Sequence, residues 1–252
     1  MTAAKQLRVP DIRARQGGPL VCLTAYSASI AALADEAADL VLVGDSLGNV
    51  LYGWDTTLPV TLDMMIAHGE VVARICRRAL VVVDLPFGSY QESRAQAFAS
   101  AARVLKETGA AAVKLEGGKE MAETVAFLTG RGVPVLGHVG LMPQQVHARG
   151  GFKRESDVEK VIADAKAIQE AGAFALVLEG VTPEVAKAVT EKTAVPTIGI
   201  AAGESCDGEI RVTEDLLGLN PSPPPFAETD KALRPAMQAC LAAFAKKARR
   251  EG

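Results

Sequence analysis

One repeated pattern constrains the fold of this chain more than any other feature: a short apolar run, a polar tip and then a stretch with helical periodicity. The runs are rich in Val, Leu and Ile and are continuously apolar rather than alternating. Such strands are typical of a parallel sheet that is covered by helices. Seven runs are clear and an eighth is fainter, in chain order 21–26, 40–46, 80–86, 111–117, 133–140, 174–180, 196–203 and the faint 212–219.

Stretches with helical periodicity separate these runs, most clearly at 93–108, 157–171 and 183–193. About eight strands that alternate with helices in 252 residues fit a (β/α)8 TIM barrel of typical length better than a doubly wound sheet. A dinucleotide-binding sheet would need GxGxxG after its first strand, and TAYSAS at 24–29 is not that motif. We therefore predict an α/β protein with one (β/α)8 barrel domain over 1–252 and a C-terminal helix over 232–250.

Composition excludes several classes of function. Lys and Arg number 27 against 30 Asp and Glu, a net charge of −3, so the chain has no general excess of positive charge for nucleic acid. The apolar runs are far shorter than the ~20 residues that span a bilayer, and the N-terminal sequence has no secretory apolar stretch. The four cysteines have no CxxC spacing. We expect a cytoplasmic protein with small-molecule partners and no nucleic acid or membrane partner.

Polar residues interrupt the runs near their C-terminal ends, where a barrel of this type carries its chemistry. Lys114 and Glu116 are two residues apart, so both point into the barrel while Val113 and Leu115 point to the helices. Because an unpaired buried charge is costly, several carboxylates at one barrel mouth need cations. The candidate residues are Asp45 in VGDSLG, Asp84 in VVVDLP, Lys114 and Glu116 in AVKLEGG, His138 in VLGHVG and Glu179 in LVLEG.

These residue types indicate magnesium and enolate chemistry. Asp45, Asp84 and Glu116 offer the oxygen ligands that a hard divalent ion prefers, directly or through waters, and zinc is disfavoured because no Cys or His grouping accompanies them. Mg²⁺ can chelate a 2-oxo acid and stabilise the enolate that forms when a base removes the adjacent proton. Glu179, on another strand, is the candidate base, since burial among apolar residues would raise its pKa. Lys114 supplies a positive charge nearby.

A structural interpretation stands beside the functional one. A single strand-end acid can serve only a salt bridge or a helix cap, and His138 can be a core histidine whose nitrogens are satisfied by its neighbours. Ser46, next to Asp45, can donate a hydrogen bond to substrate or cap the segment that follows. Five charged residues on successive strands favour a functional site over coincidence.

Several motifs follow one another along most of the chain: VGDSLG at 43–48, TTLPVT at 56–61, DLPFGSYQ at 84–91, VKLEGG at 113–118, GHVGLMPQ at 137–144, GGFK at 150–153, LVLEG at 176–180 and CDG at 206–208. In this order, and from about VPDIRARQGG at 9–18 onward, the chain resembles the ketopantoate hydroxymethyltransferase (3-methyl-2-oxobutanoate hydroxymethyltransferase) family. So many motifs in register are far more specific than any one of them.

The resemblance implies an activity and partners. A hydroxymethyl group would pass from 5,10-methylenetetrahydrofolate to 3-methyl-2-oxobutanoate, which gives 2-dehydropantoate in pantothenate and coenzyme A biosynthesis. Members are Mg²⁺-dependent barrels related to the phosphoenolpyruvate/pyruvate superfamily, and bacterial members are commonly homodecamers, so a large homo-oligomer is implied.

The resemblance also implies roles for single residues. Glu179 would be the base that removes the C3 proton of the oxo acid. The metal shell would be Asp45, Asp84 and Glu116, and the oxo acid would lie against Asp45, Ser46, Asp84 and Lys114 with His138 beside it.

Three positions depart from the family pattern. Ser27 stands where an acidic residue is usual, Trp54 where a histidine is common, and Ala201 where the usual GIGAG has glycine. None is a predicted metal or base position. We expect these loops to contact the folate or a neighbouring subunit.

Two other functions compete with this one. Another Mg²⁺-dependent barrel enzyme that acts on a pyruvate-like enolate, such as a lyase or phosphonomutase, would need no folate. A non-catalytic barrel that binds a metabolite would bind the oxo acid without exchanging its C3 proton, and the combination of Glu179 with the acids speaks against it.

Overall fold

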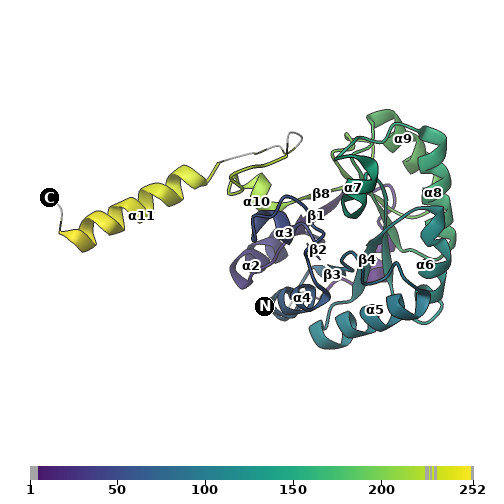
Figure 1. Ribbon diagram of the computed structural model, residues 1–252, viewed down its shortest axis with the longest axis horizontal. Coiled ribbons are helices and arrows are strands. Elements are labelled where there is room, and N and C mark those ends of the chain that lie inside the picture. The colour runs from purple at the N-terminus through teal and green to yellow at the C-terminus, as the bar shows by residue number, and fades with distance from the viewer. Residues whose placement is uncertain (1–4, 225–226, 228, 230–231, 251–252) are drawn as a thin grey trace. The chain divides into compact units, whose positions relative to one another are not determined.

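The first part of the structure is a closed parallel barrel. The computed structural model describes residues 5–224, 227, 229 and 232–250, and the chain divides into two compact units, residues 1–210 and 211–252. Eight strands close the barrel in sequence order (Figure 1), which confirms the (β/α)8 prediction. The strands are β1 (Leu20–Thr24), β2 (Leu40–Val43), β3 (Leu80–Asp84), β4 (Ala112–Glu116), β5 (Val135–Gly140), β6 (Ala175–Glu179), β7 (Thr197–Ile200) and β8 (Gly208–Arg211).

Helices connect the strands and cover the outside of the barrel (Figure 1). The sequence locates three of them closely, because Ser93, Asp157 and Thr182 each accept a hydrogen bond from a backbone N–H in the first turn of the helix that follows. The α-helices of the first unit are α1 (Val9–Arg13), α2 (Ala28–Ala37), α3 (Leu47–Val50), α4 (Leu62–Ile75), α5 (Arg94–Thr108), α6 (Ala122–Thr129), α7 (Val146–Arg149), α8 (Val158–Glu170) and α9 (Pro183–Lys192). Short 3₁₀ turns cover Lys119–Met121 (η1) and Pro143–Gln145 (η2).

Alternation along the strands sorts side chains between the inside and the outside of the barrel. On β4, Ala112 belongs to the apolar cluster of the interior, and the inward series continues with Lys114 and Glu116. Val113 and Leu115 belong to the outer cluster between strands and helices, as the sequence predicts. The neighbouring strands follow the same alternation, so the barrel interior is apolar at the N-terminal ends of the strands and polar at their C-terminal ends, the mouth of the barrel.

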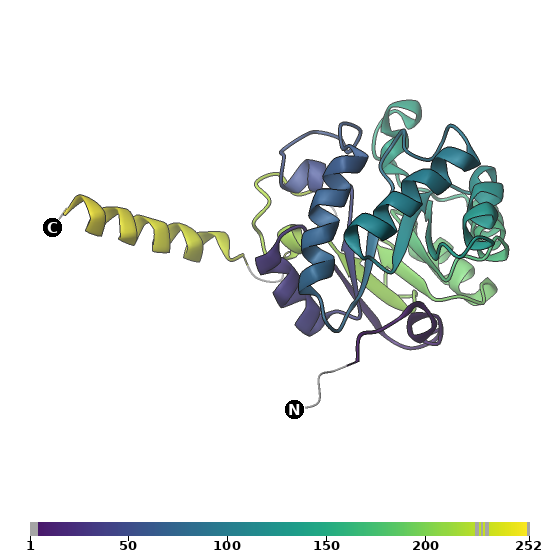
Figure 2. The same ribbon diagram turned by 90° about the horizontal axis from the view of Figure 1, so that it is seen from below.

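The N-terminal segment closes the end of the barrel opposite to that mouth. Ile12 of α1, the dark purple helix near the N-terminus in Figure 2, is 1% exposed and packs in the interior cluster. Asp207, in the CDG motif, accepts hydrogen bonds from the backbone N–H groups of Gly17 (2.7 Å) and Thr197 (2.8 Å). The CDG motif therefore ties the N-terminal segment to β7 and lies away from the mouth.

The prediction of an eighth strand over 212–219 is wrong. The strand is Gly208–Arg211, and the residues predicted as a strand instead contain the short helix α10 (Thr213–Leu216). Only Ile210 of β8 is buried, so this short strand lacks the continuous apolar run that marks the other seven. In the second unit, α11 (Arg234–Arg249) lies within the stretch 232–250 for which the sequence predicts a helix. Among the described residues, none of the helices has the length and apolar character needed to cross a membrane.

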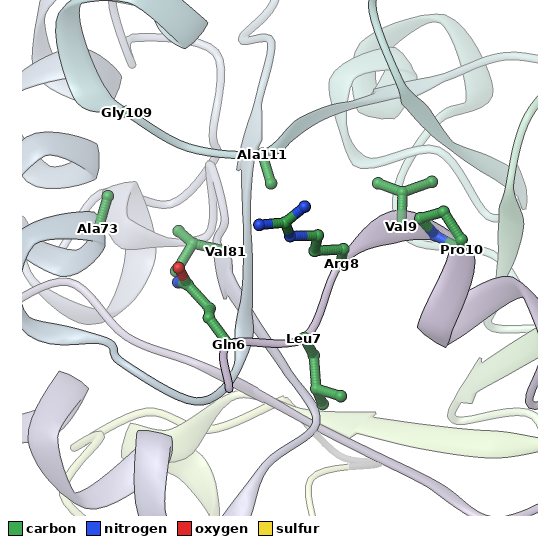
Figure 3. A pocket seen from close by; sticks show the side chains of 9 residues that line it. All are labelled: Gln6, Leu7, Arg8, Val9, Pro10, Ala73, Val81, Gly109 and Ala111. Carbon is green, nitrogen blue, oxygen red and sulfur yellow. The ribbon is translucent and has the colours of Figure 1, made fainter. Parts of the chain in front are cut away.

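A cavity of about 350 Å³ lies at the N-terminal ends of β3 and β4 (Figure 3). Its wall includes Gln6, Arg8, Val81 and Ala111, and none of the predicted site residues. Gln6 donates a side-chain hydrogen bond to the carbonyl of Ala79. This cavity is thus part of the closed end of the barrel and not of the mouth.

Ala201 generates a prediction about stability. Its φ of 51° lies in the left-handed region, which is unfavourable for an alanine but open to the glycine that the family resemblance implies here. We expect Ala201→Gly to raise the free energy of unfolding by about 0.5–1 kcal/mol, measured by urea denaturation. Gly203→Ala is the reverse control: φ is +78° and a new Cβ would lie 3.2 Å from Pro183. This variant should lose stability, and a change of the same sign in both variants would contradict the argument.

Candidate functional site

Four adjacent strands bring five of the predicted residues together at the barrel mouth, and Asp45 and Ser46 follow the next strand, β2. The register pairs Asp84 of β3 with Lys114 of β4, and Glu116 of β4 with His138 of β5. Glu179, the last residue of β6, pairs with Gly140 of β5. Parallel strands in register end at one rim, so residues that are far apart in sequence meet there.

Asp84 is the centre of a buried ion pair. Lys114 Nζ donates to Asp84 Oδ1 at 2.7 Å, and the backbone N–H of Asp45 donates to Asp84 Oδ2 at 3.0 Å. Asp84 is 2% and Lys114 8% exposed. Both oxygens of Asp84 are therefore occupied by donors from β4 and from the end of β2.

The electrostatics of this pair reflect burial among like charges. Burial raises the pKa of Asp84 to about 6. The charge of Lys114 opposes this rise, and the charge of Asp45 adds to it. Burial disfavours the charged form of Lys114, but Asp84 and Asp45 outweigh it and hold the pKa of the ammonium above its usual value. Lys114 therefore stays charged.

A second group lies on β4 to β6. His138 Nε2 is 3.3 Å from Glu179 Oε2, and its Nδ1 is 3.9 Å from Glu116 Oε2. His138 is 1% exposed, and besides these two acids its ring meets the backbone of Leu141.

Both acids of this second group hold protons more tightly than free carboxyl groups. Burial raises the pKa of Glu179 to about 8, with Asp45 and Asp84 adding to the rise and Lys114 opposing it. Burial and the charge of Asp45 raise the pKa of Glu116 well above its usual value. Burial, helped by Lys114, lowers the pKa of His138 far below its usual value, so the imidazole is neutral. Glu179 thus has the raised pKa that the sequence predicts for a base.

Gln144, which the sequence analysis did not single out, is the most connected side chain of the site. Its Nε2 donates to Asp45 Oδ2 at 2.9 Å, and its backbone N–H donates to Glu116 Oε1 at 3.1 Å. The hydroxyl of Tyr90 donates to Gln144 Oε1 at 2.8 Å. Both residues stand in quoted motifs, GHVGLMPQ and DLPFGSYQ, but a search for charged residues at strand ends passes over uncharged ones in loops.

Ser46 lies beside the acids with its hydroxyl 2.7 Å from the hydroxyl of Tyr26. Ser46 has no side-chain role as a helix cap. Ser27, one of the three departures, caps α2 by accepting from the N–H of Ile30. An acidic residue could make the same cap, so this substitution keeps the local structure. Trp54, the second departure, stacks on Tyr52 with ring centroids 4.8 Å apart.

A magnesium ion fits the chemistry of the donor set. Asp45, Asp84, Glu116 and Glu179 supply four buried or largely buried carboxyl groups, against the single ammonium of Lys114. In the described part of the chain, no three His, Cys, Asp or Glu side chains are arranged to hold a metal ion by themselves. Mg²⁺ usually keeps several waters and takes only one or two carboxylates plus substrate oxygens, so it needs no such cage.

The chain is similar to one protein family over most of its length. The family model described as ketopantoate hydroxymethyltransferase matches residues 6–252. A 3-methyl-2-oxobutanoate hydroxymethyltransferase of Rhodospirillum centenum is 57% identical over 248 residues, 96% of this chain and 90% of that protein. The enzyme of the same name from Rhodospirillum rubrum is 60% identical over 224 residues, 86% of this chain and 81% of that protein.

Solved structures share the fold at low sequence identity. A phosphonopyruvate hydrolase in complex with oxalate and Mg²⁺ has a TM-score of 0.65 at 15% identity, covering 98% of this chain and 89% of that chain. A 2,3-dimethylmalate lyase, a member of the PEP mutase/isocitrate lyase superfamily, has a TM-score of 0.61 at 18% identity, covering 98% of this chain and 86% of that chain. These similarities show the barrel architecture alone.

The buried ion pair generates a prediction about stability. Lys114→Met would leave Asp84 without its counter-charge and raise its pKa further above the unfolded value of about 3.9. When the pKa of a carboxyl group is higher in the folded than in the unfolded protein, the free energy of unfolding falls as pH increases through the range between the two values. We therefore expect a loss of about 3–5 kcal/mol in the free energy of unfolding at pH 8 and a smaller loss at pH 5, measured by urea denaturation.

Lys119→Met, the same substitution at an exposed lysine, should change stability by less than about 0.5 kcal/mol at both pH values. An equal loss at pH 5 and pH 8 for Lys114→Met would show that the ammonium acts through packing and not through charge.

Proposed function

This chain belongs to the ketopantoate hydroxymethyltransferase family, and from that premise we propose that it transfers a hydroxymethyl group from 5,10-methylenetetrahydrofolate to 3-methyl-2-oxobutanoate. The product is 2-dehydropantoate, a precursor in pantothenate and coenzyme A biosynthesis. The observation that carries the proposal is that Glu179, with a raised pKa, lies at the same mouth as the Asp84–Lys114 pair in a chain with such relatives.

The metal of this site is Mg²⁺ in our proposal. Asp45 and Asp84 would hold it, with Glu116 acting directly or through water. When bound, Mg²⁺ supplies a Lewis acid that stabilises the negative charge developing on the keto oxygen of the oxo acid. The excess of carboxyl groups over ammonium groups at the mouth supports this assignment.

The oxo acid would bind against Lys114 and Ser46, with Asp45 and Asp84 beside it. Lys114 Nζ has three N–H donors and gives one to Asp84, so it can give another to the substrate carboxylate. The Ser46 hydroxyl can donate to a substrate oxygen while it accepts from Tyr26, whose hydroxyl lies 2.7 Å away. These contacts would orient the C3–H bond of the substrate toward Glu179.

Glu179 would take the C3 proton, and the carbanion electron pair at C3 would form the new bond to the methylene carbon of the folate donor. One water completes the balance: its oxygen and one hydrogen become the new hydroxyl, and both carbon–nitrogen bonds of the donor break. The other water hydrogen and the proton taken by Glu179 go to the two nitrogens of the released tetrahydrofolate. Neutral His138, 3.3 Å from Glu179 Oε2, adds no positive charge that would lower the basicity of Glu179. His138 would lie beside the substrate, where its imidazole can meet a substrate oxygen or water.

The two competing functions are not favoured. The lyase and mutase structures that share the fold are only 14–19% identical, so they support no assignment of reaction. A non-catalytic barrel has no use for a buried glutamate beside three further acids.

We also propose a homo-oligomer, a homodecamer by family resemblance, located in the cytoplasm. The second unit supports an assembly, because α11 carries large exposed apolar side chains. They are Met237, Leu241 and Phe244.

Replacing the base tests the proposed function. We expect wild type to exchange the C3 proton of 3-methyl-2-oxobutanoate with D₂O in the presence of Mg²⁺, followed by NMR. Glu179→Gln should slow this exchange by about 10²- to 10⁴-fold, the usual contribution of a general base. 2-Dehydropantoate should form only when tetrahydrofolate and formaldehyde, the source of the one-carbon donor, are added.

The matched control is Glu184→Gln, at an exposed glutamate in the first turn of α9, which should exchange at the wild-type rate. A wild type that binds the acid but exchanges nothing would defeat the enolate mechanism and favour the binding-protein alternative. Turnover of the oxo acid without folate would favour a lyase.

The raised pKa of Glu179 predicts a pH dependence. Because the base must be deprotonated and its pKa is about 8 without metal, the exchange rate at low substrate should rise with pH, up to about tenfold per unit below the apparent pKa. A bound cation favours the carboxylate, so the apparent pKa with Mg²⁺ should lie below 8. Rates measured from about pH 5 to 9 at several Mg²⁺ concentrations check this. A rate that falls with rising pH would contradict a carboxylate base.

A further inference from the structure

We propose that Gln144 is a positioning residue, which holds Asp45 with one fixed oxygen free for Mg²⁺ and substrate. This inference rests on the proposed function and extends it to a residue in the loop after β5. Gln144 is the second residue of η2 and is 6% exposed. It touches none of the reacting atoms in our proposal and would act through Asp45 and Glu116.

The contacts of Gln144 determine which way its amide points. Its Oε1 accepts from the Tyr90 hydroxyl at 2.8 Å and from Gln91 Nε2 at 3.0 Å. Its Nε2 donates to the carbonyl of Leu85 at 3.1 Å, a group that can only accept. A flipped amide would place its oxygen against that carbonyl, so Nε2 must face Asp45.

This orientation of the Gln144 amide makes the two carboxylate oxygens of Asp45 different. Oδ2 accepts from Gln144 Nε2 at 2.9 Å, whereas Oδ1 has no hydrogen bond to any described residue. The rotation of the Asp45 carboxylate is therefore restrained from one side. Oδ1 is the atom of Asp45 that the structure leaves for a cation.

Gln144 also restrains the second acid. Its backbone N–H donates to Glu116 Oε1 at 3.1 Å. Gln144 thus forms hydrogen bonds both with Asp45, which follows β2, and with Glu116, which ends β4. Donors from one residue hold both in place.

Gln144 differs from Lys114 in carrying no charge. Lys114 compensates Asp84 with an ion pair, whereas the amide holds Asp45 without neutralising it. The negative charge of Asp45 thus stays available to attract Mg²⁺. A residue that positions a metal ligand in this way typically changes metal affinity about 10- to 100-fold when it is replaced.

The test measures metal binding directly. Gln144→Met keeps the length of the side chain and removes the amide, and we expect the Kd for Mg²⁺ measured by calorimetry to rise about tenfold or more. C3 exchange at saturating Mg²⁺ should recover most of the wild-type rate, because Glu179 is untouched. Gln145→Met is the matched control, since that amide contacts Met142 Sδ and Arg149 and none of the acids.

The outcomes separate the two proposals. A folded Gln144→Met variant with a Kd within twofold of wild type would overturn the role of Gln144 and leave the proposed function intact. If wild type itself binds no Mg²⁺, the proposed metal site fails and the role of Gln144 falls with it, whereas the transfer reaction is still tested by its dependence on folate. Circular dichroism establishes whether the variant is folded.

A crystal structure of wild type with Mn²⁺ decides the question even where the variant does not fold. The expected result is a metal on Asp45 Oδ1 with the Gln144–Asp45 hydrogen bond intact. A metal bound through Oδ2, with that hydrogen bond broken, would overturn the proposal.

Discussion

The burial of several like charges around one lysine is the constraint on which the site depends. Lys114 reaches Asp84 at 2.7 Å inside the barrel, and without that contact the acids from β2, β3 and β4 would share a poorly solvated space with no cation. The single ammonium of Lys114 does not compensate the burial of all these carboxyl groups, because the pKa values of Asp84, Glu116 and Glu179 are all raised. A site with this imbalance is ready for a cation and for a base that works near neutral pH.

Much of this arrangement follows from the sequence because it depends on strand periodicity. Lys114 and Glu116 point inward because they are two apart on a strand whose other residues fill the outer core, and strand ends in a parallel barrel must meet. Polar residues after apolar runs were therefore enough to locate Asp84, His138 and Glu179 in one place. The raised pKa of Glu179 follows from the same burial.

Other features depend on loop conformation, which periodicity does not describe. Gln144 is uncharged and lies in a 3₁₀ turn, so only the folded backbone reveals that it touches Asp45. β8 escaped recognition because a strand with a single buried side chain has no apolar run. The unfavourable backbone of Ala201 is visible only in its φ of 51°, which the sequence does not show.

The hydrogen bond between Gln144 and Asp45 joins residues 99 positions apart, and this separation affects the order in which the site is built. Asp84 and Lys114 are 30 positions apart, so the ion pair can form when the first four strands assemble. Closing the longer loop has the larger entropic cost, and the segment after β5 is made later on the ribosome. A nascent chain that lacks this segment contains Asp45, Asp84, Glu116 and Lys114, but neither Glu179 nor the amide that orients Asp45. The hydrogen bond that orients Asp45 can therefore form only after the segment that follows β5 has joined the barrel.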